Sequence, residues 1–381
     1  MQDRKLVTIR RVKEIKPIKK ADLIELIIVD GWHVVAKKGE FKVGDKAVYF
    51  EIDSFLPLLP EFEFLEKTSK KKMNEVDGLR LKTIKLRGQI SQGLLLPYNS
   101  FERFYNNATY DIGDDITDLL GVIKYETPIP TSLAGDVKGN FPSFIRKTDQ
   151  ERIQNLFDEY SADYLDNNEH MIGELEMNPI KNLSFEESLK LDGTSYTYYI
   201  ANTDKYSIKV DEDMDVRSDV YFGHCSRNLE SKENESTPWI IAKELGFKEE
   251  LHKYYIETNR SIAVQGELMG PKIQGNREKL SKGTFYVFEV WDIDNQCYFT
   301  PLERKDLIDS IEGLVQVPIL NTDIKPFIKF HTIEDILDYA KGASITHKIR
   351  EGVVFKSNGL VDGNTISFKV INNDFLLNGG D

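Results

Sequence analysis

The sequence has little cysteine and no long apolar run. Its 381 residues include two cysteines, Cys225 and Cys297, which lack metal-ligand spacing and are too few for a disulfide framework. No segment has the length of uninterrupted apolar residues that crosses a bilayer, and the N-terminal MQDRKLVTIRRVKEIK has no signal-peptide core. We therefore expect a soluble protein of a reducing compartment, cytoplasmic or else nucleoid or nuclear, with no membrane partner.

An excess of positive charge is also lacking, since the formal net charge is −13. Affinity for polyphosphates comes from Lys and Arg, so the composition by itself argues against a nucleic-acid binder. Residues 1–100 nevertheless contain 20 Lys and Arg against 14 Asp and Glu, a net of +6, which leaves −19 for the other 281 residues. The positive charge is thus concentrated at one end of the chain.

The first third of the chain alternates apolar and polar residues in short runs separated by glycine. This pattern predicts an all-β module of about five strands, an OB-like barrel over residues 1–123. Its exposed rows include the basic residues of LRLKTIKLRGQISQGLLLP, which we interpret as an alternating set on one strand that follows a phosphate backbone. The basic candidates are Arg80, Lys82, Lys85 and Arg87, next to Lys70, Lys71 and Lys72, which can equally be a solvated loop.

Residues 124–147 are rich in proline and glycine without a regular period, which indicates a linker. Thr148 followed by Glu151 has the spacing of a capping box and predicts a helix over DQERIQNLFDEY. Beyond it, helices and aromatic-rich strands do not alternate regularly. We expect residues 148–381 to form an α+β domain of mainly antiparallel sheets flanked by helices.

The tetrad Lys190-x-Asp192-Gly193 stands directly before the strand-like SYTYYI. Alone it is a weak motif, because a chain of this composition contains such a tetrad by chance in roughly one case in ten. A lysine that attacks phosphorus also needs carboxylates for a metal ion and further cations for phosphate. The hypothesis therefore requires partners elsewhere in the chain.

Charged residues at predicted turns and strand ends supply these partners. Arg227 lies in the turn-like FGHCSRNLE, and Glu267 lies where a strand meets a glycine and proline turn. Glu351 and Lys369 lie on a predicted hairpin that contains the turn signals Asn-Gly and Asp-Gly. Lys356 is a weaker candidate, because a regular pleat would place it on the face opposite Glu351.

The ordered strings KLDGTS, CSRN, QGELMGPKIQGN, FYVFEVWDI, REGVVFK and SFKVIN resemble motifs I, Ia, III, IIIa, IV and V of covalent nucleotidyltransferases. These comprise ATP-dependent DNA ligases, RNA ligases and mRNA capping enzymes. GELMGPKIQGN and TDQERIQN are most similar to nick-sealing RNA ligases, and the front segment resembles the OB module of RNA ligases of the Deinococcus and Naegleria type. The resemblance covers nearly the whole chain.

The resemblance implies roles for individual residues. Lys190 would attack the α-phosphate of ATP, Lys369 would neutralise that phosphate, and Phe288 would stack on adenine, although an aromatic residue in such a strand is more often part of a core. Arg227 would contact phosphate or ribose, and Glu267 the ribose hydroxyl. A hydrated Mg²⁺ or Mn²⁺ would be held by Asp192, Glu267 and Glu351. The catalytic set is Lys190, Asp192, Glu351 and Lys369.

Two positions depart from the family pattern. Ile371 stands where many relatives have a second lysine, and Leu189 stands where some ligases have an acidic residue that reads the adenine amine. A backbone carbonyl would then read the amine. His224 and Cys225 are interpreted as structural.

The resemblance implies an ATP-dependent RNA ligase that joins 3′-hydroxyl and 5′-phosphate RNA ends, at nicks in a duplex, and acts as a monomer. Lysyl-AMP and RNA-adenylate would be its intermediates, and removing the front module is expected to spare lysyl-AMP formation. The alternatives are a DNA ligase or capping enzyme, or a non-catalytic OB-fold RNA-binding protein. DNA ligases and capping enzymes carry an OB domain after motif V, whereas this sequence ends 12 residues after Lys369, which favours an RNA ligase.

Overall fold

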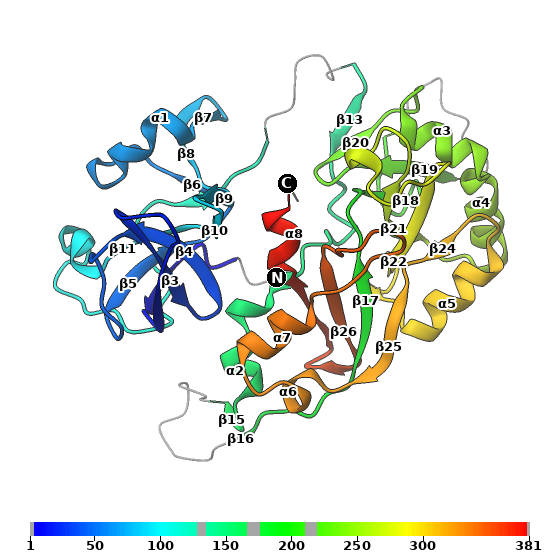
Figure 1. The fold of residues 1–381 in the computed structure, drawn as a ribbon. Coiled ribbons are helices and arrows are strands. Elements are labelled where there is room, and N and C mark those ends of the chain that lie inside the picture. Colours follow the sequence, from blue (N-terminus) through cyan, green and yellow to red (C-terminus); the bar gives the residue numbers. More distant parts are fainter. Residues whose placement is uncertain (1–3, 128–134, 166–175, 210–218, 379–381) are drawn as a thin grey trace.

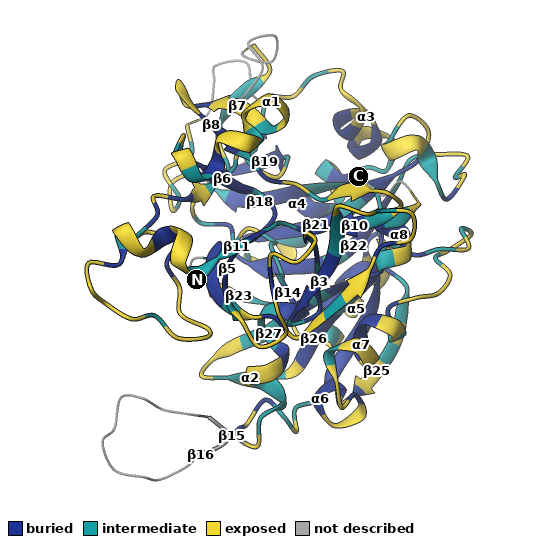
Figure 2. Cartoon of the chain, turned by 60° about the vertical axis from the view of Figure 1, so that its left-hand side comes forward, coloured by how far each residue is buried: buried dark blue, intermediate teal, exposed yellow. Residues whose placement is uncertain are grey.

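The computed structural model describes residues 4–127, 135–165, 176–209 and 219–378. The chain forms a smaller front part and a larger second part, with the C-terminal helix α8 (Asn373–Leu377) between them (Figure 1). Buried residues lie mainly along the strands, while the outer helices and loops carry most of the exposed surface (Figure 2). No helix of the described residues is long and apolar enough to cross a membrane.

The front part consists of short strands arranged in small antiparallel sheets. The strand orders are β1-β5-β11, β2-β3-β4, β12-β6-β8-β7 and β9-β10. Inward-facing apolar residues of these strands, such as Val48, Phe50 and Trp32, form its cores. The elements are β1 (Val7–Arg11), β2 (Glu14–Pro17), β3 (Ile24–Val29), β4 (Trp32–Lys37), β5 (Lys46–Phe50), β6 (Ser54–Leu56), η1 (Pro60–Leu65), α1 (Glu66–Ser69), β7 (Lys70–Met73), β8 (Val76–Arg80), β9 (Ile84–Leu86), β10 (Gln89–Ser91), β11 (Leu94–Pro97), η2 (Tyr98–Phe104) and β12 (Ile123–Lys124).

The predicted basic strand is wrong. Arg80 ends β8, Lys85 lies in β9, and Arg87 lies in the turn to β10 with a φ of 50°. Arg87 and Gly88 both have positive φ, so the chain reverses between β9 and β10 instead of continuing. The basic side chains are therefore divided among three elements. The three consecutive lysines 70–72 lie on the exposed strand β7 rather than in a loop.

The second part contains two mainly antiparallel sheets that contribute to one cavity. The larger sheet has the order β13-β20-β19-β18-β21-β22-β23, with β24 beside β22, and the smaller one has the order β14-β27-β26-β17-β25. Helices α3, α4 and α5 pack on the larger sheet through residues such as Trp239, Phe247 and Leu307. Helices α2, α6 and α7 pack on the smaller one.

The strands of the second part are β13 (Val137–Asn140), β14 (Glu151–Arg152), β15 (Tyr164–Leu165), β16 (Glu176–Met177), β17 (Phe185–Lys190), β18 (Thr194–Asn202), β19 (Val220–Cys225), β20 (Leu229–Ser231), β21 (Ile262–Met269), β22 (Thr284–Asp292), β23 (Cys297–Tyr298), β24 (Val315–Gln316), β25 (Ile319–Ile324), β26 (Gly352–Val361) and β27 (Asn364–Ile371). The helices are η4 (Ile153–Asn155), α2 (Phe157–Ser161), α3 (Thr237–Glu244), α4 (Phe247–Thr258), η5 (Gln274–Asn276), α5 (Pro301–Ser310), α6 (Pro326–Lys329), α7 (Ile333–Tyr339) and α8 (Asn373–Leu377).

The helix predicted over DQERIQNLFDEY is also wrong in most of its length. Glu151 and Arg152 form the strand β14, which pairs in parallel with Phe368 and Lys369 of β27. A short 3₁₀ turn and the five-residue helix α2 follow. The hydrogen bonds to a distant strand outweigh the local capping signal at Thr148.

The predicted linker 124–147 touches both parts where it is described. Ile123 and Lys124 pair with β6 of the front part, and Val137–Asn140 pair with β20 of the larger sheet. Residues 128–134 lie outside the described residues.

The two parts meet along a polar and an apolar contact. Asn155 accepts hydrogen bonds from Arg10 and Trp32 and donates to Glu51, all in the front part. Near the C-terminal end, Ile90 of β10 packs against Phe375 of α8. These contacts join the front part to the sheets that carry the candidate site.

Candidate active site

Lys190, Asp192 and Gly193 occupy the crossover between the two sheets. Lys190 is the last residue of β17 in the smaller sheet, and β18 of the larger sheet begins at Thr194. A Cβ atom on Gly193 would lie 2.5 Å from the carbonyl oxygen of Leu268, so a side chain does not fit. Its N–H donates to Glu267 Oε1 at 3.0 Å. The tetrad therefore fixes Glu267 as well as Lys190.

Strand register brings Glu351 to Lys190. Lys190 pairs with Gly352, the first residue of β26. Glu351 directly precedes this residue, and its Oε1 lies 2.5 Å from Lys190 Nζ. Since Glu351 lies outside the strand, the pleat argument against Lys356 does not hold, and Lys356 also lines the cavity.

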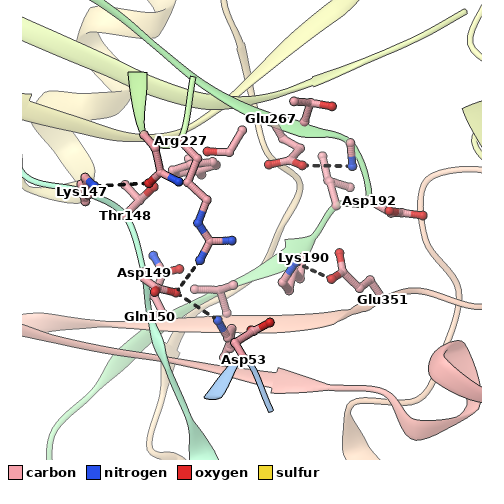
Figure 3. Close-up of a pocket in the computed structure, with 18 of the residues that line it drawn as sticks. Asp53, Lys147, Thr148, Asp149, Gln150, Lys190, Asp192, Arg227, Glu267 and Glu351 are labelled. Carbon is pink, nitrogen blue, oxygen red and sulfur yellow. Dashed lines mark hydrogen bonds and ion pairs between the residues drawn. The ribbon is translucent and has the colours of Figure 1, made fainter. Parts of the chain in front are cut away.

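All the sequence-predicted site residues line one cavity of about 1370 Å³. It opens between the two sheets and the front part, and Figure 3 shows Lys190, Asp192, Glu267, Glu351 and Arg227 around it. Their catalytic roles stay predictions. The predicted residues on its wall are Lys190, Asp192, Arg227, Glu267, Phe288, Glu351, Lys356 and Lys369.

The carboxylates of Asp192, Glu267 and Glu351 make one side of this cavity acidic (Figure 3). Burial, opposed by Lys190 and reinforced by Glu351, raises the pKa of Glu267 to about 7. Asp192 lies 3.8 Å from Arg277 Nε, measured from Oδ2. No three His, Cys, Asp or Glu side chains in the described part of the chain lie close enough to hold a metal ion directly. An all-carboxylate set of this kind fits a hydrated hard cation whose waters contact the oxygens.

Phe288 also lines the cavity, where it packs against the cluster of Leu189, Leu191 and Val317. It is the extra residue of a bulge, because Gln265 pairs with Glu289 and Gly266 pairs with Val287. A bulge redirects the side chain it carries, here onto the cavity wall. This partly buried ring is available to a planar ligand.

A buried charge network supports Phe288. Lys356 donates to the carbonyl oxygen of Phe288, and its Nζ lies 2.5 Å from Glu289 Oε2. Glu289 lies 3.6 Å from Arg304, which also pairs with Glu186. All four charged side chains are at most 7% exposed, and paired buried charges of this kind fix geometry more than they add stability.

Arg227 and Lys369 meet at Asp149, a residue that the sequence analysis did not select. Asp149 Oδ1 lies 3.2 Å from Arg227 and 3.5 Å from Lys369 Nζ, and Asp149 also pairs with Lys124 (Figure 3). Burial would raise the pKa of Asp149, but Lys369, Lys124 and Arg227 outweigh it and hold this pKa well below its usual range. Asp149 belongs to the TDQERIQN string, whose resemblance to RNA ligases was the available signal.

The positive charge of Lys369 is balanced less fully by its neighbours than the negative charge of Asp149 is. Burial lowers the pKa of Lys369 to about 8, with Asp149 opposing the effect and Arg152, Lys190 and Arg4 adding to it. Arg152 lies beside Lys369 because β14 and β27 pair at these residues. This part of the cavity therefore carries an excess of positive charge.

The front part contributes cations to the same cavity. Arg4, Arg80 and Lys82 line it, as do Lys147 and Arg227 of the second part. Arg80 stacks on Tyr125, with its Cζ 4.4 Å from the ring centroid. From the sequence, Arg80 and Lys82 were candidates for RNA binding only, because local patterns do not reveal that they line the same cavity as Lys190.

Comparison with known proteins identifies the family. A family model described as RNA ligase matches residues 184–371, and one described as an OB-fold domain matches residues 6–98. A mutant of the Naegleria gruberi RNA ligase with AMP and Mn shares 40% identity over 99% of both chains, with a TM-score of 0.72. This chain belongs to the RNA ligase family.

Two further structures of the Naegleria enzyme agree. A mutant with ATP and Mn shares 40% identity over 99% of this chain and 100% of that chain, with a TM-score of 0.71. The enzyme with PPi shares 40% identity over 98% of both chains, with a TM-score of 0.70. A comparison with curated proteins finds no match. The predicted N-terminal OB fold and α+β ligase domain are confirmed.

The departures from the family pattern are apolar contacts in this ligase. Ile371 is 3% exposed and packs with Ile90 and Phe375, so it joins the ligase domain to the OB fold. Leu189 is buried with Leu191 and Met269. His224 is buried, with its Nδ1 2.6 Å from Ser231 Oγ, and burial lowers its pKa to about 3. Burial also raises the pKa of Cys225, and neither residue lines the cavity.

Proposed function

We propose that this RNA ligase uses ATP to join a 3′-hydroxyl end to a 5′-phosphate end of RNA, through lysyl-AMP and RNA-adenylate. The observation that carries the proposal is the position of Lys190 on the crossover, with its amine against Glu351 in a cavity lined by further carboxylates and cations. A nucleophilic lysine, carboxylates for a cation and basic groups for phosphate are the parts this chemistry needs.

In the first step, Lys190 Nζ attacks the α-phosphorus of ATP. A P–N bond forms, the bond from this phosphorus to the bridging oxygen breaks, and pyrophosphate leaves. The amine must lose a proton before it attacks, and the Glu351 oxygen at 2.5 Å is placed to accept it. Lys369 lies in the same cavity to offset the negative charge of the phosphate.

In the second step, an oxygen of the RNA 5′-phosphate attacks the phosphorus of lysyl-AMP, and the P–N bond breaks to give RNA-adenylate. In the third, the 3′-hydroxyl oxygen attacks the 5′-phosphate phosphorus and AMP leaves. The 3′-hydroxyl proton is released in that step. These bond changes regenerate the free lysine and form one phosphodiester per ATP.

Asp192, Glu267 and Glu351 would hold a hydrated Mg²⁺ or Mn²⁺, which would offset phosphate charge when bound. The relative's structures with Mn and ATP or AMP support this cofactor set. Phe288 would stack on adenine, and Glu267 and Arg227 would contact ribose or phosphate. We also propose that the ligase acts as a monomer in a reducing compartment, on nicked duplexes.

Incubation of the full-length protein with α-³²P-labelled ATP and Mg²⁺ or Mn²⁺, followed by a denaturing gel, tests the first step. The wild-type protein is expected to become labelled, and Lys190→Met is expected to lose the label. Lys305→Met is the matched control, since Lys305 is exposed, paired with Asp309 and not among the residues that line the cavity. A label that persists in Lys190→Met would place the nucleophile elsewhere.

Sealing assays test the substrate. A nicked duplex with RNA strands at the break is expected to be sealed faster than an all-DNA nick of the same sequence. Equal rates would favour a DNA ligase, and binding without any adduct would favour a non-catalytic RNA-binding protein. The mass of the active species by light scattering tests the monomer.

A further inference from the structure

Asp149 lies inside the candidate active site and bridges three parts of the molecule. Lys124 ends β12, which pairs with β6 of the front part. Arg227 lies in the turn between β19 and β20, and Lys369 lies in β27. Each pairs with the one Asp149 carboxylate. The close-up shows Asp149 pointing toward Arg227 within the cavity (Figure 3).

The cations around Asp149 exceed the negative charge that they receive from it. Lys124, Arg227 and Lys369 pair with one carboxylate. Arg152 is the strand partner of Lys369, and its guanidinium Cζ lies 5.4 Å from the centroid of the Trp32 ring. Arg152 is 8% exposed and lines the cavity, and its Nη1 has no hydrogen-bond partner among the described residues. A buried, unsatisfied donor in the same cavity as surplus positive charge is suited to an anion with several oxygens.

The ion pair between Arg227 and Asp149 can be broken without disturbing the hydrophobic core. The Arg227 side chain is 62% exposed, so it can leave Asp149 and remain solvated. Asp149 itself is 22% exposed, and Lys369 is 18% exposed. A phosphate dianion that approaches Arg227 and Lys369 competes for the same donors, because both anions require the same N–H groups.

We propose that Asp149 is an internal stand-in for a substrate phosphate: its carboxylate occupies the donors of Arg227 and Lys369, and a phosphate-bearing ligand displaces it. Asp149 thus lowers the affinity of the site for phosphate and holds the cations in place until the ligand arrives. The inference rests on the proposed function for the class of ligand, a terminal phosphate or a pyrophosphate. Its test below needs no catalysis.

The experiment measures binding to full-length wild-type protein and Asp149→Asn by calorimetry. The probes are inorganic pyrophosphate and a 5′-phosphorylated oligoribonucleotide, with the 5′-hydroxyl oligoribonucleotide as reference. Asp149→Asn is expected to bind at least one phosphate probe about tenfold more tightly, a factor within the usual range of coupling between competing interactions. A gain for pyrophosphate alone identifies the nucleotide phosphates as the displacing group, and a gain for the 5′-phosphate alone identifies the RNA end.

Asp30→Asn is the matched control, since Asp30 is 10% exposed, pairs with Arg10 and Lys13, and does not line the cavity. It should leave both affinities unchanged. Unchanged or weaker phosphate binding by folded Asp149→Asn, or an equal gain in Asp30→Asn, overturns the proposal. If Asp149→Asn folds poorly, Asp149→Ser removes the same charge and gives the same test.

If the wild-type protein forms no lysyl-AMP, the proposed function is refuted, but the binding result can still be interpreted. Conversely, normal adenylation with no gain in phosphate affinity would refute the stand-in alone. The two proposals therefore fail separately.

Discussion

Replacing Asn155 with alanine should loosen the OB fold from the ligase domain. The Asn155 Oδ1 accepts from Arg10 Nη2 at 3.0 Å and from Trp32 Nε1 at 3.2 Å. Its Nδ2 donates to Glu51 Oε2 at 2.9 Å and to Glu151 Oε1 at 3.1 Å. Three of these four partners belong to the OB fold, so one side chain carries much of the polar contact between the parts.

The size of the effect follows from the partners. A hydrogen bond to a charged group contributes about 1.5–3 kcal/mol and a neutral one about 1 kcal/mol, with further cost when a buried partner is left unsatisfied. Glu51 is 1% exposed and Trp32 is fully buried. Because bonds to one side chain are not additive, we expect Asn155→Ala to lower the free energy of unfolding of the OB fold by about 3 kcal/mol.

Urea titration followed by tryptophan fluorescence measures this loss, since Trp32 lies at the contact. Asn358→Ala is the control: Asn358 is exposed, and its amide makes two hydrogen bonds within the ligase domain. A loss in Asn155→Ala no larger than in the control would refute the reasoning. Lysyl-AMP formation should fall in parallel, because the OB fold supplies Arg4 and Arg80 to the cavity.

Two further predictions concern charge in the cavity. The second-order rate constant for lysyl-AMP formation should fall as the pH rises through about 8, because Lys369 loses the positive charge that offsets phosphate. Lys369→Arg should move this falling limb to higher pH, and an unmoved limb would assign it to another group. Arg277→Gln should slow adenylation, because Arg277 lies 3.8 Å from Asp192 and stacks on Phe375, and these two contacts hold it beside that carboxylate. The free energy of unfolding should change by less than about 1 kcal/mol. Arg277→Lys should recover part of the rate, and full activity of Arg277→Gln would contradict this positioning role.

Local patterns in the sequence were sufficient to predict much of the fold of the ligase domain. The hairpin of β26 and β27 follows from two apolar runs and the Asp-Gly turn, where Asp362 and Gly363 have φ angles of 50° and 74°. The candidate residues came from a resemblance in ordered motifs, and the fold brings all of them to one cavity. Strand pairing explains this, since the register of β17 against β26 places Lys190 next to Glu351.

The environment of Asp149 could not be predicted in the same way. The spacing of Thr148 and Glu151 fits a helix start, and nothing local contradicts it. What decides the conformation is a parallel pairing with β27, far along the chain, which also places Arg152 beside Lys369. A capping signal is worth about 1 kcal/mol, so a few hydrogen bonds to a distant strand suffice to override it.

From the charge distribution we predicted separate roles for the two domains, and the structure does not support this separation in full. Positive charge near the N-terminus favoured an OB fold that acts on RNA alone, with adenylation left to the second domain. Arg80 and Lys82 instead line the cavity that contains Lys190. A count of charges along a sequence shows how much charge a segment carries but not which way it faces. Since the same cations can contact nucleotide phosphates and RNA phosphates in turn, the OB fold is expected to contribute to both adenylation and sealing.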